Sequence, residues 1–257
     1  MRIVIKIGTS TLAHKSGLLN IRRVEELCKV MSDLKNAGNE VILVSSGAIG
    51  MGAGKLSLSE KPSDIPTKQA AAAVGQCELM YTYDKLFSEY NHTVAQILIT
   101  GEDVEHKERK ANFENTMCRL LELGAIPIIN ENDSIATDEI VIGDNDTLGA
   151  IVATAINADL LILLSDIDGL FTADPRTDKN AVLLERVEEI TPEIESMTGG
   201  AGSKFGTGGM ATKIKAAKIA TEAGIDMIIA NGKEPHILYD IIVDGKSVGT
   251  RFIARKV

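Results

Sequence analysis

The sequence predicts an α/β fold in which a mainly parallel sheet lies between helical layers. Short apolar runs alternate with amphipathic helical stretches along the 257 residues. Several of these runs, such as EVILVS at residues 40–45, are nearly continuous, which is typical of parallel strands covered on both faces. Strands that alternate with helices are joined by right-handed crossovers and lie parallel to one another. Because no low-complexity linker and no repeat interrupts the chain, we expect a single domain.

Clear local patterns predict the first two strands and the helix between them. RIVIKI at residues 2–7 predicts a strand, and the GTST that follows predicts a turn. Asn20 is a favourable N-cap for a helix that extends to Lys35, with Gly38 near its end. The apolar residues expected on the buried face of this helix recur every three or four positions: Ile21, Val24, Leu27, Met31 and Leu34. Residues 40–45 predict the second strand.

The remaining elements follow from the same patterns. Pro66 is expected to open a long helix that extends to Tyr90. Further strands are expected at residues 94–99, 125–130, 159–164, 226–230 and 248–254. Further helices are expected at residues 112–123, at residues 146–157 and directly after GTGGMATK, residues 206–213. Residues 134–142 alternate between apolar and polar and predict a hairpin, whereas residues 174–202 carry no clear pattern and are a possible subdomain boundary.

Composition narrows the class of function. The net charge of −9 disfavours nucleic acid as a partner, because binding to a phosphate backbone needs a basic face. No apolar run approaches the length of a membrane span, and the N-terminal RIVIKIG is too short for a signal peptide, so we expect a cytoplasmic protein without membrane contact. The cysteines lie far apart, which is typical of a reduced cytosolic chain: Cys28, Cys77 and Cys118. The histidines are equally scattered and offer no zinc-binding spacing.

Four polar or glycine-rich loops leave the carboxyl ends of predicted strands, where ligand sites of parallel sheets lie. They are KIGTS (6–10), SSGAIGMGAG (45–54), NENDS (130–134) and SDIDGLFTADP (165–175). Each has a plain alternative. A lysine in an apolar strand is costly to bury unpaired, but Lys6 could also reach the surface. The glycines could present backbone N–H groups to an anion or only permit a tight turn.

The other two loops are equally open to a structural explanation. NEND and the later GDND (143–146) are rich in turn-forming side chains, and neither has the spacing of an EF-hand calcium loop. SDIDGLFTADPR suits the edge of a nucleotide site or a simple polar loop.

GTGGMATK, residues 206–213, combines glycines, a lysine and the start of a helix, as phosphate-binding loops do. It is not a Walker A loop, because no glycine directly precedes Lys213 and Ile214, rather than a hydroxyl residue, follows it. It also contains G-x-G-x-x-A, but no strand precedes it, which argues against a dinucleotide fingerprint. The H-R-D and D-F-G signatures of protein kinases are absent from the sequence.

Seven motifs together resemble the amino acid kinase family, in the family's order and from Lys6 to about Phe252: KIGTS, SSGAIGMG, INENDSIAT, GDNDTL, SDIDGLFTADPR, GTGGMATK and SVGTRF. INEND, GDND and GTGGM-x-TK resemble the members that phosphorylate L-glutamate more than those that act on aspartate, acetylglutamate, carbamate or uridylate. The resemblance implies a three-layer αβα sandwich that transfers the γ-phosphoryl group of ATP to the side-chain carboxylate of L-glutamate. The product, L-glutamyl 5-phosphate, opens proline biosynthesis. Mg²⁺ is implied as a cofactor held largely by the phosphates, and no residue is assigned as its ligand.

The resemblance also implies roles for individual residues. Lys6 and Lys213 flank the transferring phosphoryl group, and Asp146 holds their two ammonium groups in place. Gly8 and Gly47 offer backbone N–H donors to the phosphoryl oxygens. The substrate-binding residues are Ser46, Gly47, Asp133 and Asn145. The ATP-binding residues are Lys6, Gly8, Ser165, Asp166, Thr207, Gly208, Gly209, Met210, Ala211, Thr212 and Lys213.

The implied organisation is a single kinase domain over residues 1–257, with an amino-acid-binding part at roughly 1–160 and a nucleotide-binding part at 161–257. Because the sequence stops at Val257, we do not expect the C-terminal RNA-modification-type (PUA) domain that many relatives carry. Family members are commonly inhibited by proline and form homodimers or homotetramers. Residues 133–143 and the region near Asp103 are therefore candidates for a proline site. Functional coupling to glutamyl phosphate reductase is a further expectation.

Two rival functions remain. One is a sibling kinase with another acceptor, such as aspartate or acetylglutamate. The other is a non-catalytic amino-acid sensor on the same fold, which could keep Asp133 and Asn145 but has no need for both lysines. The chemistry favours a kinase: a carboxylate is already a nucleophile at neutral pH and needs no general base, and the sequence offers no plausible catalytic histidine.

Overall fold

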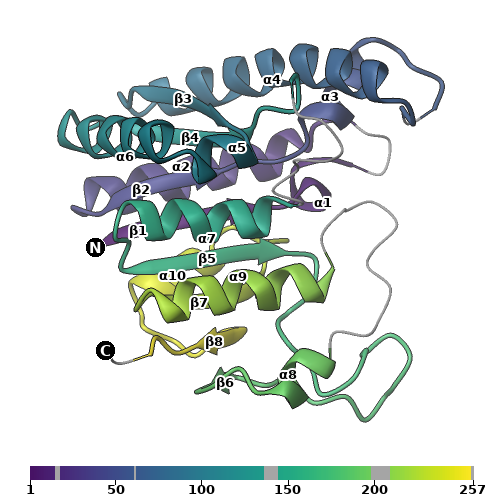
Figure 1. Ribbon diagram of the computed structural model, residues 1–257, viewed down its shortest axis with the longest axis vertical. Coiled ribbons are helices and arrows are strands. Elements are labelled where there is room, and N and C mark those ends of the chain that lie inside the picture. The colour runs from purple at the N-terminus through teal and green to yellow at the C-terminus, as the bar shows by residue number, and fades with distance from the viewer. Residues whose placement is uncertain (15–17, 61, 136–143, 198–208, 256–257) are drawn as a thin grey trace.

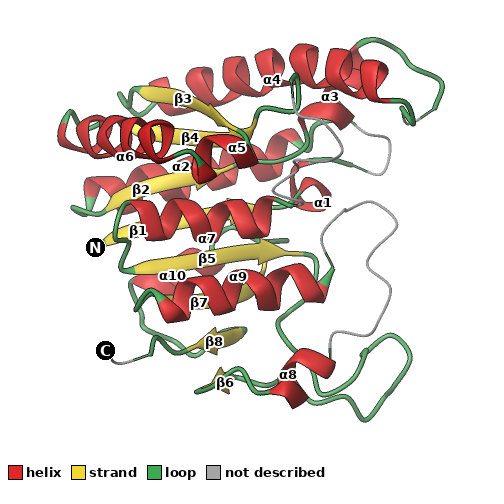
Figure 2. Cartoon of the chain, in the orientation of Figure 1, coloured by secondary structure: helices red, strands yellow, loops and turns green. Residues whose placement is uncertain are grey.

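The computed structural model describes residues 1–14, 18–60, 62–135, 144–197 and 209–255. Over these residues, one sheet of eight strands lies between helices on both of its faces (Figure 1, Figure 2). The strand order is β3-β4-β2-β1-β5-β7-β8-β6, and all neighbours are parallel except β7 and β8. The predicted α/β fold, a three-layer sandwich around a mainly parallel sheet, is confirmed.

The bounds of the elements are close to those predicted for the longer ones. The strands are β1 (Arg2–Ile7), β2 (Glu40–Val44), β3 (Val94–Ile99), β4 (Ile126–Glu131), β5 (Leu160–Ser165), β6 (Arg186–Val187), β7 (Asp226–Asn231) and β8 (Thr250–Phe252). The helices are α1 (Thr9–Leu12), α2 (Ile21–Asn36), α3 (Ala48–Lys55), α4 (Ile65–Ser88), α5 (Gly101–Glu105), α6 (Lys107–Glu122), α7 (Asn145–Ala155), α8 (Pro192–Ser196), α9 (Met210–Glu222) and α10 (Ile237–Ile242).

Two apolar cores lie on opposite faces of the sheet, and β1 contributes to both. Ile3, Ile5 and Ile7 belong to the core formed with α2, α4 and α10, whereas Val4 belongs to the core formed with α6, α7 and α9. Successive side chains of a strand point to opposite faces. Lys6 has the parity of Val4, so it emerges on the face that α7 and α9 cover.

The structure confirms most of what was predicted for α2. The Asn20 side chain accepts a hydrogen bond from the Arg23 backbone N–H at 3.3 Å and caps α2. Four of the five residues expected on its buried face are buried, but Ile21 is 62% exposed. The prediction for Ile21 is wrong because the first turn of α2 borders an open cavity instead of the sheet.

Several short elements were not predicted, and one helix is longer than expected. α6 begins five residues before the predicted residue 112, because its first turn, KERKAN, is polar and shows no apolar period. Within the described part of residues 174–202, Arg186–Val187 form β6, which pairs with β8 in the main sheet. Most of the hairpin predicted at residues 134–142 lies outside the described residues.

The glycine run after β2 forms helix α3 instead of an extended loop. Gly47 ends the turn before it with a φ of 91°, a conformation that favours glycine. Gly52 and Gly75 lie where α3 and α4 cross. A Cβ atom on Gly52 would lie 1.7 Å from the Ala71 carbonyl oxygen, and one on Gly75 would lie 1.8 Å from the Ala48 carbonyl oxygen. These two glycines therefore allow the two helix backbones to touch.

Replacing Gly52 by alanine is expected to destabilise the protein by about 3 kcal/mol, because the methyl group meets backbone that cannot rotate away. Urea unfolding followed by circular dichroism measures this loss. Gly50→Ala is the matched control: Gly50 lies in the same helix, and a Cβ atom there meets nothing within 4 Å. It should stabilise the protein by up to about 1 kcal/mol. Equal effects of the two substitutions would contradict the close contact.

Candidate active site

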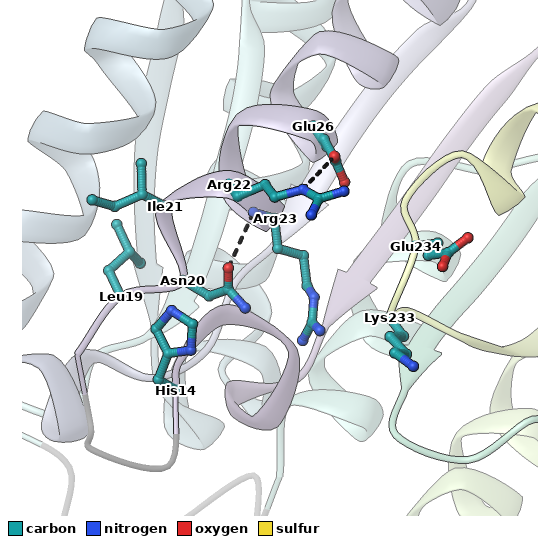
Figure 3. Close-up of a pocket in the computed structure, with 9 residues that line it drawn as sticks. All are labelled: His14, Leu19, Asn20, Ile21, Arg22, Arg23, Glu26, Lys233 and Glu234. Atoms are coloured by element: carbon teal, nitrogen blue, oxygen red, sulfur yellow. Dashed lines mark hydrogen bonds and ion pairs between the residues drawn. The ribbon is translucent and has the colours of Figure 1, made fainter.

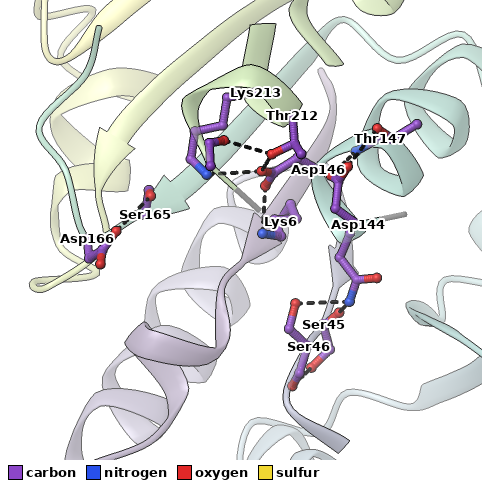
Figure 4. A network of polar contacts seen from close by, with 12 residues as sticks. Lys6, Ser45, Ser46, Asp144, Asp146, Thr147, Ser165, Asp166, Thr212 and Lys213 are labelled. Carbon is purple, nitrogen blue, oxygen red and sulfur yellow. Dashed lines mark hydrogen bonds and ion pairs between the residues drawn. The ribbon is translucent and has the colours of Figure 1, made fainter. Parts of the chain in front are cut away.

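A buried cluster of three charged residues lies at the carboxyl end of the sheet (Figure 4). Lys6 comes from β1, Asp146 from α7 and Lys213 from α9. Lys6 Nζ lies 2.6 Å from Asp146 Oδ1, and Lys213 Nζ lies 3.0 Å from Asp146 Oδ2. All three are buried, with exposed fractions of 8% for Lys6, 1% for Asp146 and 6% for Lys213. One carboxylate thus holds two lysines, one on each oxygen.

Local structure places each member of this cluster. Asp144 caps α7 by accepting the Thr147 backbone N–H at 2.8 Å, which sets Asp146 in the first turn of the helix. Gly149, one turn further along, lets α7 approach β1: a Cβ atom there would lie 3.4 Å from the Lys6 Cβ. Lys213 lies in the first turns of α9, beside α7 on the same face of the sheet (Figure 1).

The electrostatics of the cluster favour an ionised Asp146. Burial alone would raise the pKa of this carboxyl, but the charges of Lys6 and Lys213 and the hydrogen bonds that they donate outweigh burial and lower the pKa to about 2. At neutral pH the cluster therefore carries one negative and two positive charges. The surplus positive charge faces the carboxyl ends of the strands, where an anion can meet it.

A second polar cluster surrounds Asn145, the residue before Asp146. The Asn145 side-chain amide lies 2.6 Å from the Ser45 carbonyl oxygen, 2.9 Å from Ser46 Oγ and 3.0 Å from Asn130 Oδ1. Asn130 in turn donates to Gln76 Oε1 at 2.9 Å. The predicted residues Ser46 and Asn145 are thus brought together. Gln76 was missed, because a single glutamine inside a long helix carries no local signal of a role.

Asp133 is half-buried just beyond β4. Burial raises the pKa of its carboxyl to about 6. Within the described residues, this carboxylate has no hydrogen-bond or ion-pair partner. A half-buried acid without a partner is suited to receive a cationic group of a ligand.

The two predicted glycine donors differ in their surroundings. Gly47 lies directly before α3, and its neighbour across the site is the Thr9 side chain, 3.4 Å from an ideal Cβ position. The Gly8 N–H donates to the Leu164 carbonyl oxygen at 3.3 Å. It must give up this long hydrogen bond to reach a phosphoryl oxygen, so its predicted role stays a prediction.

The predicted nucleotide residues form two groups. Ser165 and Asp166 lie at the end of β5, where Ser165 Oγ donates to Asp166 Oδ1 at 3.3 Å (Figure 4). Gly209 lies directly before α9, and the residues after it form the first turn of that helix: Met210, Ala211, Thr212 and Lys213. Thr207 and Gly208 lie outside the described residues.

The late motif SVGTRF has a structural role that its sequence did not reveal. Gly249 has a φ of 71°, and a Cβ atom there would lie 2.0 Å from the Ile229 carbonyl oxygen. The buried Thr250 Oγ1 accepts the Leu170 backbone N–H at 2.7 Å. A Cβ atom on Gly169 would lie 2.5 Å from Thr250 Oγ1. The motif therefore anchors the loop after β5, which carries Asp166, to β8.

A cavity of about 420 Å³ lies away from these clusters, between the start of α2 and the turn after β7 (Figure 3). Its charged side chains are exposed or half-buried, and several are already engaged. Arg22 pairs with Glu26 at 3.1 Å, and Arg23 donates to the Thr11 carbonyl oxygen at 3.1 Å. The buried lysines gather around Asp146 and not in this cavity, so the cluster around Asp146 is the candidate active site.

The sequence was also compared with known proteins. A model of the amino acid kinase family matches residues 1–231. The chain belongs to the amino acid kinase family. It is 57% identical to the glutamate 5-kinase of Clostridium perfringens over 259 residues, which span 99% of this chain and 96% of the relative. It is 58% identical to the glutamate 5-kinase of Clostridium acetobutylicum over 254 residues, which span 99% of this chain and 95% of the relative.

Solved structures agree on the amino acid kinase fold. Carbamate kinase from Giardia lamblia bound to AMP-PNP is similar with a TM-score of 0.69 and 16% sequence identity, over 99% of this chain and 98% of that chain. At this identity the likeness concerns the fold alone. The family and the fold that the motifs predicted are confirmed. Among the helices described, none combines the length and the hydropathy that crossing a bilayer requires.

Proposed function

We propose that this amino acid kinase transfers the γ-phosphoryl group of ATP to the side-chain carboxylate of L-glutamate. The products are L-glutamyl 5-phosphate and ADP, and the reaction is the first step of proline biosynthesis. The observation that carries the proposal is the buried Asp146 with one lysine on each carboxylate oxygen. The choice of glutamate rests on the 57% identity to the Clostridium perfringens relative, over nearly the full length of both chains.

The two lysines supply the charge that the transfer needs. The glutamate carboxylate attacks the γ-phosphorus, a new P–O bond forms, and the bond to the bridging oxygen breaks in line with it, which leaves ADP. Two anions must approach each other for this. A lysine ammonium carries three N–H donors, and the contact with Asp146 uses one. Within the part of the chain that the structure describes, the remaining donors of both lysines have no other hydrogen-bond partner and can turn to phosphoryl oxygens. At 4 Å and an effective dielectric of 20, each lysine attracts a unit negative charge by about 4 kcal/mol.

Asp146 is proposed to orient the lysines and not to act as a base. Two ammonium groups on either side of one phosphoryl group repel each other, and the carboxylate between them offsets that repulsion. With a pKa near 2 it is a poor proton acceptor at neutral pH. No base is needed, because the attacking carboxylate is already ionised.

The polar cluster around Asn145 is proposed to hold the glutamate. Ser46 and Gly47 follow β2, and Asn145, which contacts Ser46, directly precedes Asp146 in α7, which supports this role. Asp133 is proposed to bind the α-ammonium group. The sibling kinases that act on aspartate or acetylglutamate are the rivals here, because the same groups suit any amino-acid-like acceptor.

ATP is proposed to bind along the ends of β5 and α9. Ser165, Asp166 and the first turn of α9, Met210 to Lys213, lie on this side of the cluster. Gly8, Thr207, Gly208 and Gly209 are proposed to meet the phosphates. Among the described residues, no three His, Cys, Asp or Glu side chains gather as a metal-binding group. Mg²⁺ is proposed to be carried largely by the phosphates, where it would supply further positive charge. On this scheme, residues 1–160 bind the amino acid and residues 161–257 bind the nucleotide.

Trapping the acyl phosphate with hydroxylamine tests the proposed reaction. ATP and L-glutamate together should give glutamyl hydroxamate, and omission of either should give none. A panel with aspartate and acetylglutamate separates the sibling kinases. Binding of glutamate without ATP consumption would instead favour the amino-acid sensor and reject the proposal.

Replacing Asp133 by alanine is expected to raise the KM for glutamate at least tenfold and to leave the KM for ATP almost unchanged, because one charge-assisted contact to the α-ammonium is lost. In the wild type, the KM for glutamate should also rise as the pH falls from 7 through about 6, because protonation removes the charge of Asp133. The variant should lack this rise. Steady-state kinetics across pH measures both effects, with the exposed Asp84→Ala as control. Equal changes in both KM values would remove Asp133 from the substrate site.

Proline inhibition, assembly and coupling are proposed by analogy with the family. Proline resembles cyclised glutamate and should compete with it, so the Asp133→Ala variant should also be less sensitive to proline. Asp103, the other candidate, is already engaged: it accepts from the Thr100 backbone N–H at 2.8 Å and from Arg109 at 3.1 Å. We also propose that the protein forms a homodimer or homotetramer and is cytoplasmic. Functional coupling to glutamyl phosphate reductase is proposed as well.

A further inference from the structure

The Asp146 carboxylate has a third donor besides the two lysines. Thr212 Oγ1 lies 2.9 Å from Asp146 Oδ2, the same oxygen that Lys213 contacts at 3.0 Å (Figure 4). Lys6 contacts the other oxygen, Oδ1. Two adjacent residues of α9 therefore hold one oxygen of the carboxylate, and β1 holds the other.

The proton of this contact belongs to Thr212. An ionised carboxylate can only accept, so the hydroxyl must donate for two oxygens to lie 2.9 Å apart. Thr212 Oγ1 also lies 2.8 Å from the Gly209 carbonyl oxygen, but the hydroxyl has only one proton. Hydrogen bonds to a charged acceptor are about twice as strong as those between neutral groups.

We propose that Thr212 is a positioning residue that fixes the Asp146 carboxylate, and through it both lysines, instead of a residue that binds ATP. This rests on the proposed phosphoryl transfer. Thr212 and Lys213 hold Oδ2 of the carboxylate, and Lys6 holds Oδ1. With both oxygens held, the carboxylate cannot rotate away from one lysine toward the other. The hydroxyl proton is then not available to a phosphate oxygen, although the family resemblance places Thr212 in the ATP-binding run.

Two adjacent residues in one turn of α9 therefore have different roles. Lys213 faces the transferring group, and Thr212 sets the position of the anion that orients Lys213. Loss of the hydroxyl should impair the transfer step without weakening nucleotide binding. If the Thr212 hydroxyl bound ATP instead, its loss would weaken nucleotide binding.

Thr212→Val and Thr212→Ser test the proposal, with Thr221→Val as the matched control. Thr221 lies on the same helix and is also a buried threonine, but its hydroxyl donates to the Ala217 carbonyl oxygen at 2.8 Å and not to Asp146. Kinetics of glutamyl hydroxamate formation gives kcat and both KM values. Calorimetry with ATP and Mg²⁺ in the absence of glutamate gives the nucleotide Kd. Circular dichroism verifies the fold, and Thr212→Ala replaces Thr212→Val if the latter does not fold.

We expect Thr212→Val to lower kcat about tenfold or more, the effect of losing one hydrogen bond to a charged group, with the ATP KM and Kd within about twofold of wild type. Thr212→Ser should recover most of kcat, and Thr221→Val should match the wild type. A nucleotide Kd that rises in Thr212→Val overturns the proposal, and so does an unchanged kcat or a Thr212→Ser variant as slow as Thr212→Val. Absence of glutamate-dependent turnover in the wild type rejects the proposed function instead, and the calorimetric Kd then still decides between the two roles of Thr212.

Discussion

Replacing Lys213 by alanine is expected to lower kcat about 100- to 1,000-fold, and replacing Lys6 should have an effect of similar size, as is typical for the loss of one electrostatic donor to a transition state. Both ammonium groups are buried, so water does not screen them or substitute for them. Each acts in a low-dielectric setting, where an attraction of about 4 kcal/mol at 4 Å is available. Steady-state kinetics with saturating ATP and glutamate measures the loss.

Lys215→Ala is the matched control for this prediction. Lys215 lies two residues further along α9 but is exposed, so its removal should leave kcat within about twofold. The Lys6→Ala and Lys213→Ala losses should not multiply in the double variant, because both lysines act on one group through one carboxylate. Near-normal turnover in either single variant would contradict the two-lysine arrangement.

Replacing Asp146 by asparagine is expected to cost about 3–5 kcal/mol of folding stability and most of the activity. The change keeps the shape but leaves two buried ammonium groups without their anion. Urea unfolding at pH 7 measures the loss of stability. Asp240→Asn serves as control: its partner Lys246 is more than half exposed, and such surface pairs are worth at most about 1 kcal/mol.

A second substitution separates charge from packing in the Asp146→Asn variant. Adding Lys6→Met removes one of the two unpaired charges and should restore part of the lost stability. The pH dependence has a defined sign, because the pKa of Asp146 is lowered to about 2 in the folded protein. The stability that this carboxylate contributes is complete above pH 4 and is lost as the pH falls toward 2. The gap between wild type and variant should therefore narrow in acid. A gap that widens there would contradict the ionised carboxylate.

Continuous apolar runs made the long strands predictable. β1, β5 and β7 agree within one residue with their predicted ranges, because a strand buried on both faces needs a largely apolar sequence. The short elements α1, α5, α8 and α10 were not predicted, because four to six residues are too few to show a helical period. The glycine run was ambiguous for another reason. Close contact at Gly52 depends on a partner in α4, which no local pattern reveals.

The candidate site could be predicted in part for the same reasons. Lys6 came from a motif at a strand end and Lys213 from a glycine-rich motif, whereas the role of Asp146 came from the family resemblance. The structure places all three together. The contact between Thr212 and Asp146 could not be foreseen, because it depends on the rotation of α9 about its axis relative to α7. The link from Asn130 to Gln76 joins residues that are 54 positions apart.

The central place of β1 has a consequence for how the protein folds. β1 is made first but lies between β2 and β5, so its second neighbour is synthesised only after about residue 160. Lys6 and Asp146 are 140 residues apart, and Asp146 and Lys213 another 67. Such distant pairings close late and slowly. Until α9 has left the ribosome, a nascent chain lacks Lys213, so the cluster around Asp146 can assemble only after residues 210–222 have been made.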